Sequence, residues 1–274
     1  MLTKNSRLSS FQREALLIED LDVKEFGGRV LKEEYDGRYF WVTNNAARSS
    51  RSDAGIEKRI VNEIIVKNPK WHRIFDLYAG FGISSYIFSK NSEKVVALER
   101  DPETYLLLKR NLKGIANVEP VNDDNVYYLE KCIEDKLEPN TLVDLDPFGG
   151  PEAQFLLTLE LMEHGAILLT NGQIEGVYRN SIGIRHLYAW IDKYAGHKAT
   201  RWAEEVYFPR LRGFAEEKGR ELRLVHYYVH PTSLRFILEL GSFEFSKEVK
   251  DELSKRPHFL DWFQRVEQPG FSFE

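Results

Sequence analysis

Two polar segments carry the residues whose types could do chemistry, and each directly follows a short apolar run. The later segment, residues 144–150, reads Asp-Leu-Asp-Pro-Phe-Gly-Gly, and the earlier one, residues 76–82, reads Asp-Leu-Tyr-Ala-Gly-Phe-Gly. Glycines at such a turn let a nucleotide-like cofactor approach the backbone closely. A carboxylate, a proline and an aromatic ring at a strand end can hold an exocyclic amino group and stack on its base. Together the segments favour an enzyme that acts on a base nitrogen.

In the later segment, Asp146 is the expected catalytic residue, because its carboxylate can accept a hydrogen bond from a base amino group and help remove the proton. The carbonyl of Pro147 can accept a second bond, and Phe148 can stack on the base, a contact worth about 1–3 kcal/mol. We expect only one of Asp144 and Asp146 to face a substrate, because we place them on opposite faces of the strand. The alternative is a strand-ending turn, since Asp-Pro and Gly-Gly both form turns.

The earlier segment is the expected cofactor loop, with Asp76, Tyr78, Gly80 and Gly82 as binding residues. A helix should follow the loop and direct its N-terminus at the cofactor. Glu99 ends the next predicted strand, where an acidic side chain meets ribose hydroxyls in dinucleotide-binding sheets. The full Gly-x-Gly-x-x-Gly of NAD sites is absent, whereas Asp-x-x-x-Gly-x-Gly is typical of enzymes that use S-adenosylmethionine (SAM). A purely structural turn is the alternative.

Two further positions are candidate SAM contacts. Asp123, after the third predicted strand, could accept a hydrogen bond from the adenine amino group, although it or Asp124 could instead cap the following helix. Arg51 could pair with the carboxylate of the methionine moiety. Asp53 could simply cap the helix that follows it.

The elements that must position these residues alternate between strand and helix, which predicts an α/β fold: a mostly parallel sheet with helices on both faces and an antiparallel closing hairpin. An Asp-Gly pair at residues 36–37 predicts a separate hairpin near the N-terminus. The predicted strands of the sheet are residues 74–77, 95–98, 118–121, 142–145, 167–170, 222–228 and 234–240. The predicted helices are residues 56–67, 83–90, 102–114, 125–134, 152–164, 184–195 and 246–254.

Composition limits the function classes further. The 274 residues carry a net charge of −5, which argues against indiscriminate nucleic-acid binding without excluding a local basic face. No apolar run approaches the roughly 20 residues needed to span a bilayer, and the N-terminus lacks the apolar stretch of a signal peptide, so we expect a cytoplasmic protein with no membrane partner. The single Cys132 and the scattered histidines predict neither a disulfide nor a metal site.

Residues 198–223 mix basic and aromatic side chains, a composition that suits a nucleic-acid groove. Glutamates nearly balance the charge, so an ordinary amphipathic helical pair is an equal alternative. The candidate nucleic-acid-binding residues are Arg201, Arg210, Arg212 and Arg220.

The tetrapeptide at residues 146–149, Asp-Pro-Phe-Gly, resembles the signature of the tRNA guanine N2-dimethyltransferases, a family of class I SAM methyltransferases. Residues 51–53 are similar to an Asn-Arg-Asp segment ahead of that family's first helix, and residues 214–219 through His230 and Arg235 are similar to its late helix and closing hairpin. The sequence departs from the family pattern at Ser50 and Gly150, which stand where the family has Asn and Ser.

This resemblance covers about residues 30–240 and implies a Rossmann-like fold, SAM as methyl donor and tRNA as substrate. The site residues that it implies are Arg51, Asp76, Glu99, Asp123 and Asp146. We therefore expect an N-terminal extension with a hairpin at 1–55, a methyltransferase domain at 56–240 and a helical, aromatic tail at 241–274, without the family's C-terminal domain. A DNA adenine-N6 methyltransferase, a small-molecule methyltransferase and a catalytically silent binding module remain alternatives.

Overall fold

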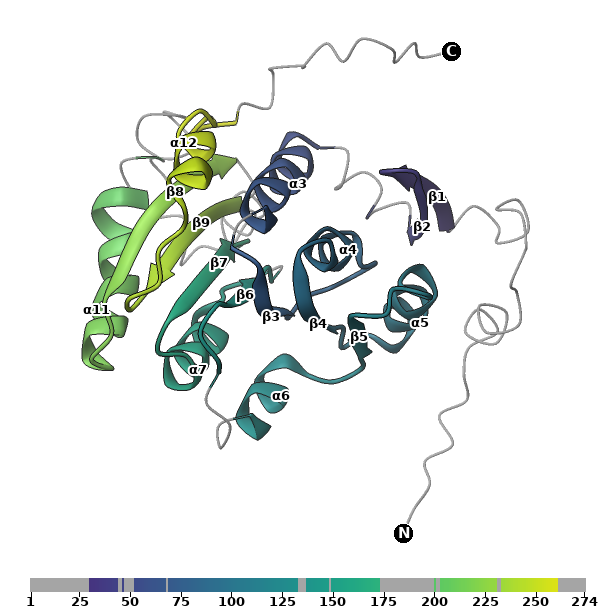
Figure 1. Ribbon diagram of the computed structural model, residues 1–274, viewed down its shortest axis with the longest axis horizontal. Coiled ribbons are helices and arrows are strands. Elements are labelled where there is room, and N and C mark those ends of the chain that lie inside the picture. Colours follow the sequence, from purple (N-terminus) through teal and green to yellow (C-terminus); the bar gives the residue numbers. More distant parts are fainter. Residues whose placement is uncertain are drawn as a thin grey trace, which may run out of the picture.

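A mostly parallel β-sheet forms the centre of the protein in the computed structural model (Figure 1). Within the residues that the structure describes, the sheet has seven strands in the order β5-β4-β3-β6-β7-β9-β8. β9 runs antiparallel to both of its neighbours, and the other adjacent pairs are parallel. The predicted α/β class with an antiparallel closing hairpin is confirmed. The residues described are 30–43, 46, 52–67, 69–132, 137–147, 149–172, 200, 203–230 and 233–260.

The elements follow the predicted alternation, with most boundaries shifted by a few residues. The strands of the sheet are β3 (Trp71–Asp76), β4 (Ser92–Leu98), β5 (Val118–Val121), β6 (Thr141–Leu145), β7 (Gly165–Asn171), β8 (Leu222–His230) and β9 (Ser233–Leu240). The helices are α3 (Asp53–Val66), α4 (Ile83–Ser89), α5 (Pro102–Asn111), α6 (Asn125–Lys131), α7 (Glu152–Leu161), the π-helical turn η2 (Ala203–Tyr207), α11 (Phe208–Glu217) and α12 (Lys247–Leu253). The predicted helix at 184–195 lies outside the described residues.

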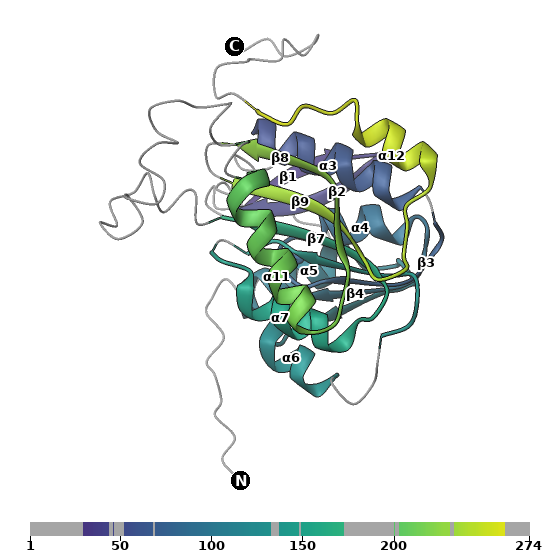
Figure 2. The ribbon, with the colours of Figure 1, turned by 90° about the vertical axis from the view of Figure 1, so that its left-hand side faces the viewer.

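Helices cover both faces of the sheet, and the side view separates the two layers (Figure 2). α6, α7 and α11 pack on one face through a core that includes Leu129, Phe155 and Leu211. α3, α4 and α12 pack on the other face, where Ile65 and Phe88 are fully buried. Because both faces are covered, the central strands are apolar nearly throughout, as expected for buried parallel strands.

Local signals explain where helix α5 begins and ends. Its N-cap, Asp101, accepts a hydrogen bond from the Thr104 backbone N–H at 2.8 Å, and Pro102 occupies the first turn. Gly114, at φ +84°, follows the helix in the left-handed conformation that glycine adopts without strain. The helix therefore ends at Asn111, three residues before the predicted end.

The N-terminal hairpin consists of β1 (Val30–Tyr35) and β2 (Arg38–Thr43). Asp36 and Gly37 form its turn with φ values of +50° and +71°, as the Asp-Gly signal requires. Asn111, at the end of α5, accepts from the Trp41 backbone N–H at 2.8 Å and donates to the Trp41 carbonyl at 2.9 Å. The predicted hairpin is thus confirmed, and it packs beside the sheet near α5.

The residues after β9 pack back onto the sheet. Phe243 stacks on the buried Trp71 with ring centroids 5.4 Å apart, and α12 contributes Val249 and Leu253 to the same core as α3. Arg256, after α12, forms a bidentate ion pair with the buried Glu57 of α3. None of the helices described is both long and apolar enough to cross a membrane.

The order of strands creates a reversal in the sheet. From β3 the chain moves outward to β4 and β5, and it then returns to place β6 on the other side of β3. In open α/β sheets, ligands bind outside the carboxyl ends of the strands at such a switch point. The fold therefore directs attention to the ends of β3 and β6.

Candidate active site at the carboxyl edge of the sheet

The two polar segments singled out in the sequence meet at this switch point. β3 pairs with β6 in a register that sets Asp76 opposite Asp144, so the cofactor loop and the Asp-Pro segment leave the sheet side by side. Glu99 directly follows β4 and Asp123 follows β5 at the same edge. The structure thus brings these candidate residues together, whereas the side chains of Arg51 and Phe148 lie outside the described residues.

The loop after β3 depends on glycine. Gly80 and Gly82 have φ values of +53° and +88°, and a Cβ on Gly82 would lie 2.8 Å from Leu108 of α5. The buried Asn111 donates to the Phe81 carbonyl at 2.9 Å and so supports the loop from behind. This geometry lets the backbone turn sharply between β3 and α4, at the place where a cofactor would approach.

Glu99 lies against the same loop. Its carboxylate accepts from the backbone N–H groups of Gly80 at 3.2 Å and Asp101 at 2.7 Å. Partial burial raises the pKa of Glu99, and these two hydrogen bonds offset part of that effect. Because the side chain remains partly exposed, it can also accept hydrogen bonds from hydroxyl groups of a ligand.

Asp76 faces the interior. It is 1% exposed and accepts a hydrogen bond from the Ser85 hydroxyl of α4 at 2.6 Å. Burial, together with the neighbouring charge of Asp144, raises the pKa of Asp76 to about 7. Its position indicates that Asp76 braces the start of α4 below the loop.

At the neighbouring strand end, Asp124 caps α6 by accepting from the Val126 backbone N–H at 3.0 Å. The adjacent Asp123 does not make this capping bond; its carboxylate pairs with Lys131 at 2.9 Å, and this partner lowers the pKa of Asp123. Tyr78, in the loop after β3, is partly buried, and this burial raises its pKa to about 12. The cap therefore falls on Asp124, while Asp123 also accepts from the Asp124 backbone N–H at 2.9 Å.

Asp146, directly after β6, lies between two cations. Lys58 of α3 donates to Asp146 Oδ2, and Arg235 Nη1 of β9 lies 3.9 Å from Oδ1. Burial raises the pKa of the Asp146 carboxyl, but the positive charges of Lys58 and Arg235 outweigh this effect and lower it to about 2. The side chains of Lys58 and Asp146 are each 23% exposed, so the ion pair borders solvent at the sheet edge.

Arg235 connects the site to the interior. This fully buried guanidinium forms an ion pair with Asp144 at 3.0 Å and donates to Thr170 at 2.7 Å and to Asn62 at 3.0 Å. The expectation that Asp144 and Asp146 point to opposite faces was wrong, since both contact Arg235. Side chains two residues apart lie on the same face of a strand, and Asp144 differs from Asp146 by its burial.

Sequence reasoning did not single out Lys58 or Asn62, and it gave Arg235 no role at the site. Lys58 and Asn62 are four residues apart on α3, next to the apolar stripe that includes Val61 and Ile65. Polar side chains that border the buried apolar stripe of a helix are the signal that could have drawn attention to them.

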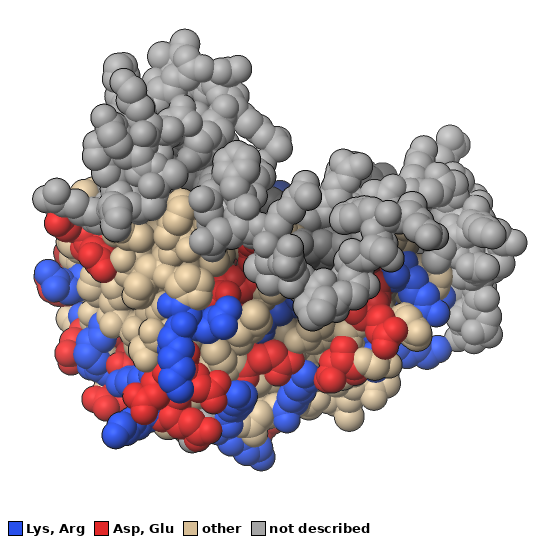
Figure 3. All heavy atoms as spheres, turned by 90° about the horizontal axis from the view of Figure 1, so that it is seen from above, with Lys and Arg blue, Asp and Glu red and all other residues tan. Residues whose placement is uncertain are grey.

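Of the candidate nucleic-acid arginines, the three that the structure describes have separate partners. Arg210 lies 5.6 Å from the Phe214 ring, Arg212 pairs with Glu216 at 3.4 Å, and Arg220 pairs with Glu163 at 3.1 Å. Glu163 directly precedes β7, so Arg220 lies at the amino end of the parallel strands, away from Asp146. Arg201 lies outside the described residues. The face seen from above also shows basic and acidic side chains interspersed over its described surface (Figure 3).

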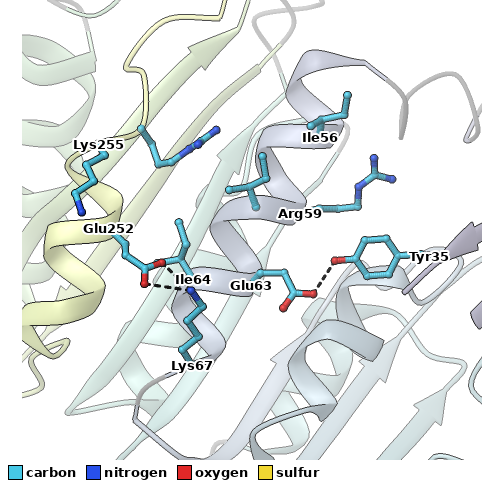
Figure 4. Close-up of a pocket in the computed structure, with 10 residues that line it drawn as sticks. Tyr35, Ile56, Arg59, Glu63, Ile64, Lys67, Glu252 and Lys255 are labelled. Atoms are coloured by element: carbon cyan, nitrogen blue, oxygen red, sulfur yellow. Dashed lines mark hydrogen bonds and ion pairs between the residues drawn. The ribbon is translucent and has the colours of Figure 1, made fainter. Parts of the chain in front are cut away.

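A separate open groove of about 470 Å³ runs along the outer side of α3, between Tyr35 of the hairpin and the α12 region (Figure 4). Ile56, Ile60 and Ile64 contribute apolar surface to it, and Lys67 pairs with Glu252 across it. Asp146 and Glu99 do not line this groove, so it is distinct from the site at the carboxyl edge.

Comparison with solved structures shows that other proteins share this fold, at sequence identities of 14–16%. The chain is similar to Trm1 from Pyrococcus horikoshii, solved in complex with S-adenosyl-L-methionine, with a TM-score of 0.58 and 16% identity over 81% of this chain and 64% of that one. It is also similar to P. horikoshii TYW2 in complex with MeSAdo, with a TM-score of 0.53 and 16% identity over 78% and 71% of the two chains. Trm5b from Pyrococcus abyssi gives a TM-score of 0.51 and 14% identity over 78% and 56%. The chain therefore spans less than two thirds of the length of Trm1 and of Trm5b.

Sequence comparison adds one short match. An uncharacterised protein of Methanothermobacter thermautotrophicus is 43% identical over 54 residues, which are 20% of this chain and 22% of that protein. No protein-family profile matches the sequence.

Proposed function

We propose that this protein is a SAM-dependent methyltransferase that modifies an exocyclic amino group of a nucleic-acid base, most like guanine N2 in tRNA. The observation that carries the proposal is Asp146: an ionised, partly exposed carboxylate at the switch point of a methyltransferase-type sheet, one strand away from a glycine loop. The similarity in fold to Trm1, whose structure was solved with SAM, supports the choice of cofactor.

The residues at the carboxyl edge fit SAM. The positive φ values of Gly80 and Gly82 turn the loop tightly at the strand end, beside the partly exposed Glu99. Glu99 would accept from the ribose hydroxyls and Asp123 from the adenine amino group, while Arg51 would pair with the methionine carboxylate. Tyr78 and the buried Asp76 would line and brace this part of the site.

The charge state of Asp146 defines its part in the reaction. When bound, SAM would supply an electrophilic methyl group to the lone pair of the substrate nitrogen. An Asp carboxylate with a pKa of about 2 is a good acceptor for an amino hydrogen but a weak base. Asp146, aided by the Pro147 carbonyl, would therefore orient the amino group first. It would take the proton only after methylation has made the nitrogen cationic and strongly acidic.

The nature of the substrate rests on the resemblance of residues 146–149 to the tRNA guanine N2-dimethyltransferases. A base must first leave its helix, and this step costs a few kcal/mol. Phe148 would then stack on the base, and the stacking would offset part of that cost. A net charge of −5 repels phosphates, so binding needs a local basic surface. Arg201, Arg210 and Arg212 are our candidates for this surface. Arg220 is left out, because it lies at the amino end of the parallel strands, away from Asp146.

Transfer of radiolabelled methyl groups from SAM to bulk tRNA, DNA and small metabolites tests the proposal. We expect label in tRNA, recovered as N2-methylated guanosine after digestion. Asp146→Ala should abolish transfer while SAM affinity, measured by calorimetry, stays within about tenfold, or 1.4 kcal/mol. Replacement of the exposed Asp251 of α12 by Ala is the control and should leave transfer unchanged.

Each other outcome contradicts a stated part of the proposal. Label at adenine N6 of DNA would replace the tRNA assignment by the DNA alternative, and label only in metabolites would exclude a nucleic-acid substrate. Turnover like that of wild type by Asp146→Ala would remove Asp146 from the reaction. Absence of SAM binding would leave the fold without the proposed activity.

A further inference from the structure

The ion pair between Lys58 and Asp146 joins a helix to the proposed catalytic strand end. Lys58 lies in the first half of α3, and its ammonium donates to Asp146 Oδ2. On the inner side, Arg235 approaches the other oxygen, Oδ1. The two cations differ in freedom, since the side chain of Lys58 is 23% exposed whereas that of Arg235 is 1% exposed.

We infer that Lys58 is a positioning residue for the proposed methyl transfer: its ammonium holds the Asp146 carboxylate aimed at the carboxyl edge of the sheet. This inference rests on the proposed function, because it assigns Lys58 a role through Asp146. Arg235 alone is poorly placed for the task, since it already pairs with Asp144 at 3.0 Å and lies 3.9 Å from Asp146.

The charges around Asp146 show why a second cation is needed. Besides Lys58 of α3, the described groups near this carboxylate are Asp144 of β6, Asp76 of β3, Tyr78 after β3, Thr170 of β7, Tyr228 of β8 and Arg235 of β9. Without Lys58, one buried guanidinium would face the carboxylates of Asp144 and Asp146, with Asp76 close by. Like charges in a buried site raise the pKa of a carboxyl group. Loss of Lys58 would therefore raise the pKa of Asp146, and below that raised pKa a protonated oxygen no longer accepts from the substrate amino group.

The mobility of lysine suits a group that must share its acceptor. An ammonium on a four-carbon stem is a rotatable point charge with three donors, whereas the guanidinium of Arg235 is fixed by Thr170 and Asn62. Lys58 can thus move along the exposed side of Asp146 when a substrate amino group arrives, while it still neutralises the carboxylate.

Carbon-13 NMR titration of the Asp146 carboxyl carbon in the whole protein, assigned with Asp146→Asn, tests the inference directly. In Lys58→Met we expect the pKa of Asp146 to rise by about one to three units, and Lys58→Arg should restore the wild-type value. Methionine keeps the length and apolar stem of lysine, so the variant should fold. Lys67→Met, which removes a lysine at the end of the same helix, is the matched control and should leave the titration unchanged.

Kinetics then separate positioning from a structural role. Asp146 stays ionised near neutral pH even with the raised pKa, so we expect Lys58→Met to lower kcat there by at least about tenfold through loss of the aim of the carboxylate alone. The acid limb of kcat should move upward with the pKa of Asp146, SAM affinity should stay unchanged, and Lys58→Arg should recover most of the rate. An unshifted Asp146 titration, or an equal loss of rate at every pH that Lys58→Arg does not recover, overturns the inference. Wild-type protein that binds SAM but methylates nothing overturns the proposed function instead, whatever the titration shows.

Discussion

Arg235 provides the sharpest test of how the interior supports the site. We predict that Arg235→Met destabilises the protein by about 3–5 kcal/mol, because the change leaves the buried Asp144 without its counter-ion. Arg235 is fully buried, and its guanidinium reaches Asp144, Thr170 and Asn62 at 2.7–3.0 Å.

The magnitude follows from this geometry. At the 3.0 Å separation of Arg235 and Asp144, the Coulomb attraction is about 5 kcal/mol with an effective dielectric constant of roughly 20. Desolvation of two charges offsets most of this gain in the intact pair, but removal of one partner leaves the cost of burying the other. The hydrogen bonds to Thr170 and Asn62 add about 1–3 kcal/mol for each buried group left without a partner. Relaxation around the shorter methionine side chain reduces the total.

Urea denaturation of wild type, Arg235→Met, Asp144→Asn and the double variant measures these terms in a double-mutant cycle. We expect Asp144→Asn to recover part of the stability lost in Arg235→Met, because it removes the uncompensated charge. Arg220→Met is the control: Arg220 pairs with Glu163 near the surface, and an exposed pair contributes about 0–1 kcal/mol. A loss below about 1 kcal/mol for Arg235→Met, or independent effects of the two changes, would refute the reasoning.

Three further predictions concern the same edge of the sheet. Gly82→Ala should lower the free energy of unfolding by about 1–3 kcal/mol more than Gly219→Ala. Both glycines have positive φ, but only at Gly82 would the new Cβ contact a neighbour, 2.8 Å from Leu108. Equal losses in urea denaturation would mean that backbone strain is the whole effect. Asp76, with its pKa raised to about 7, contributes stability that is fully present below its unfolded pKa near 4 and is lost as the pH rises through 7. Between about pH 4 and pH 8, the free energy of unfolding of wild type should therefore fall by at most about 4 kcal/mol relative to that of Asp76→Asn. A difference between the two proteins that stays constant with pH would contradict the raised pKa. Glu99→Ala should weaken SAM binding by about 10- to 150-fold, the value of one lost charge-assisted hydrogen bond, and an unchanged dissociation constant in calorimetry would place the ribose elsewhere.

The sequence by itself determined the elements and the places where chemistry could occur. Apolar runs such as 142–145 and 167–170 predicted buried strands because both faces of such strands need apolar side chains. Asp36-Gly37 predicted the hairpin, since few residue pairs other than Asn-Gly and Gly-Gly accept two positive φ values as readily. The glycines at 80 and 82 and the Asp-Pro segment at 146–147 were recognisable because their backbone requirements are local.

Only the tertiary structure decided what surrounds those residues. Lys58, Asp146 and Arg235 lie far apart in the sequence, and they meet because β7 pairs with both β6 and β9 while α3 packs on a face of the same sheet. No local pattern encodes such a contact, since its energy comes from charges that folding brings together in a poorly solvated interior. The same packing turns Asp76 inward and leaves Asp146 at the edge, so two aspartates that look alike in the sequence acquire pKa values of about 7 and about 2.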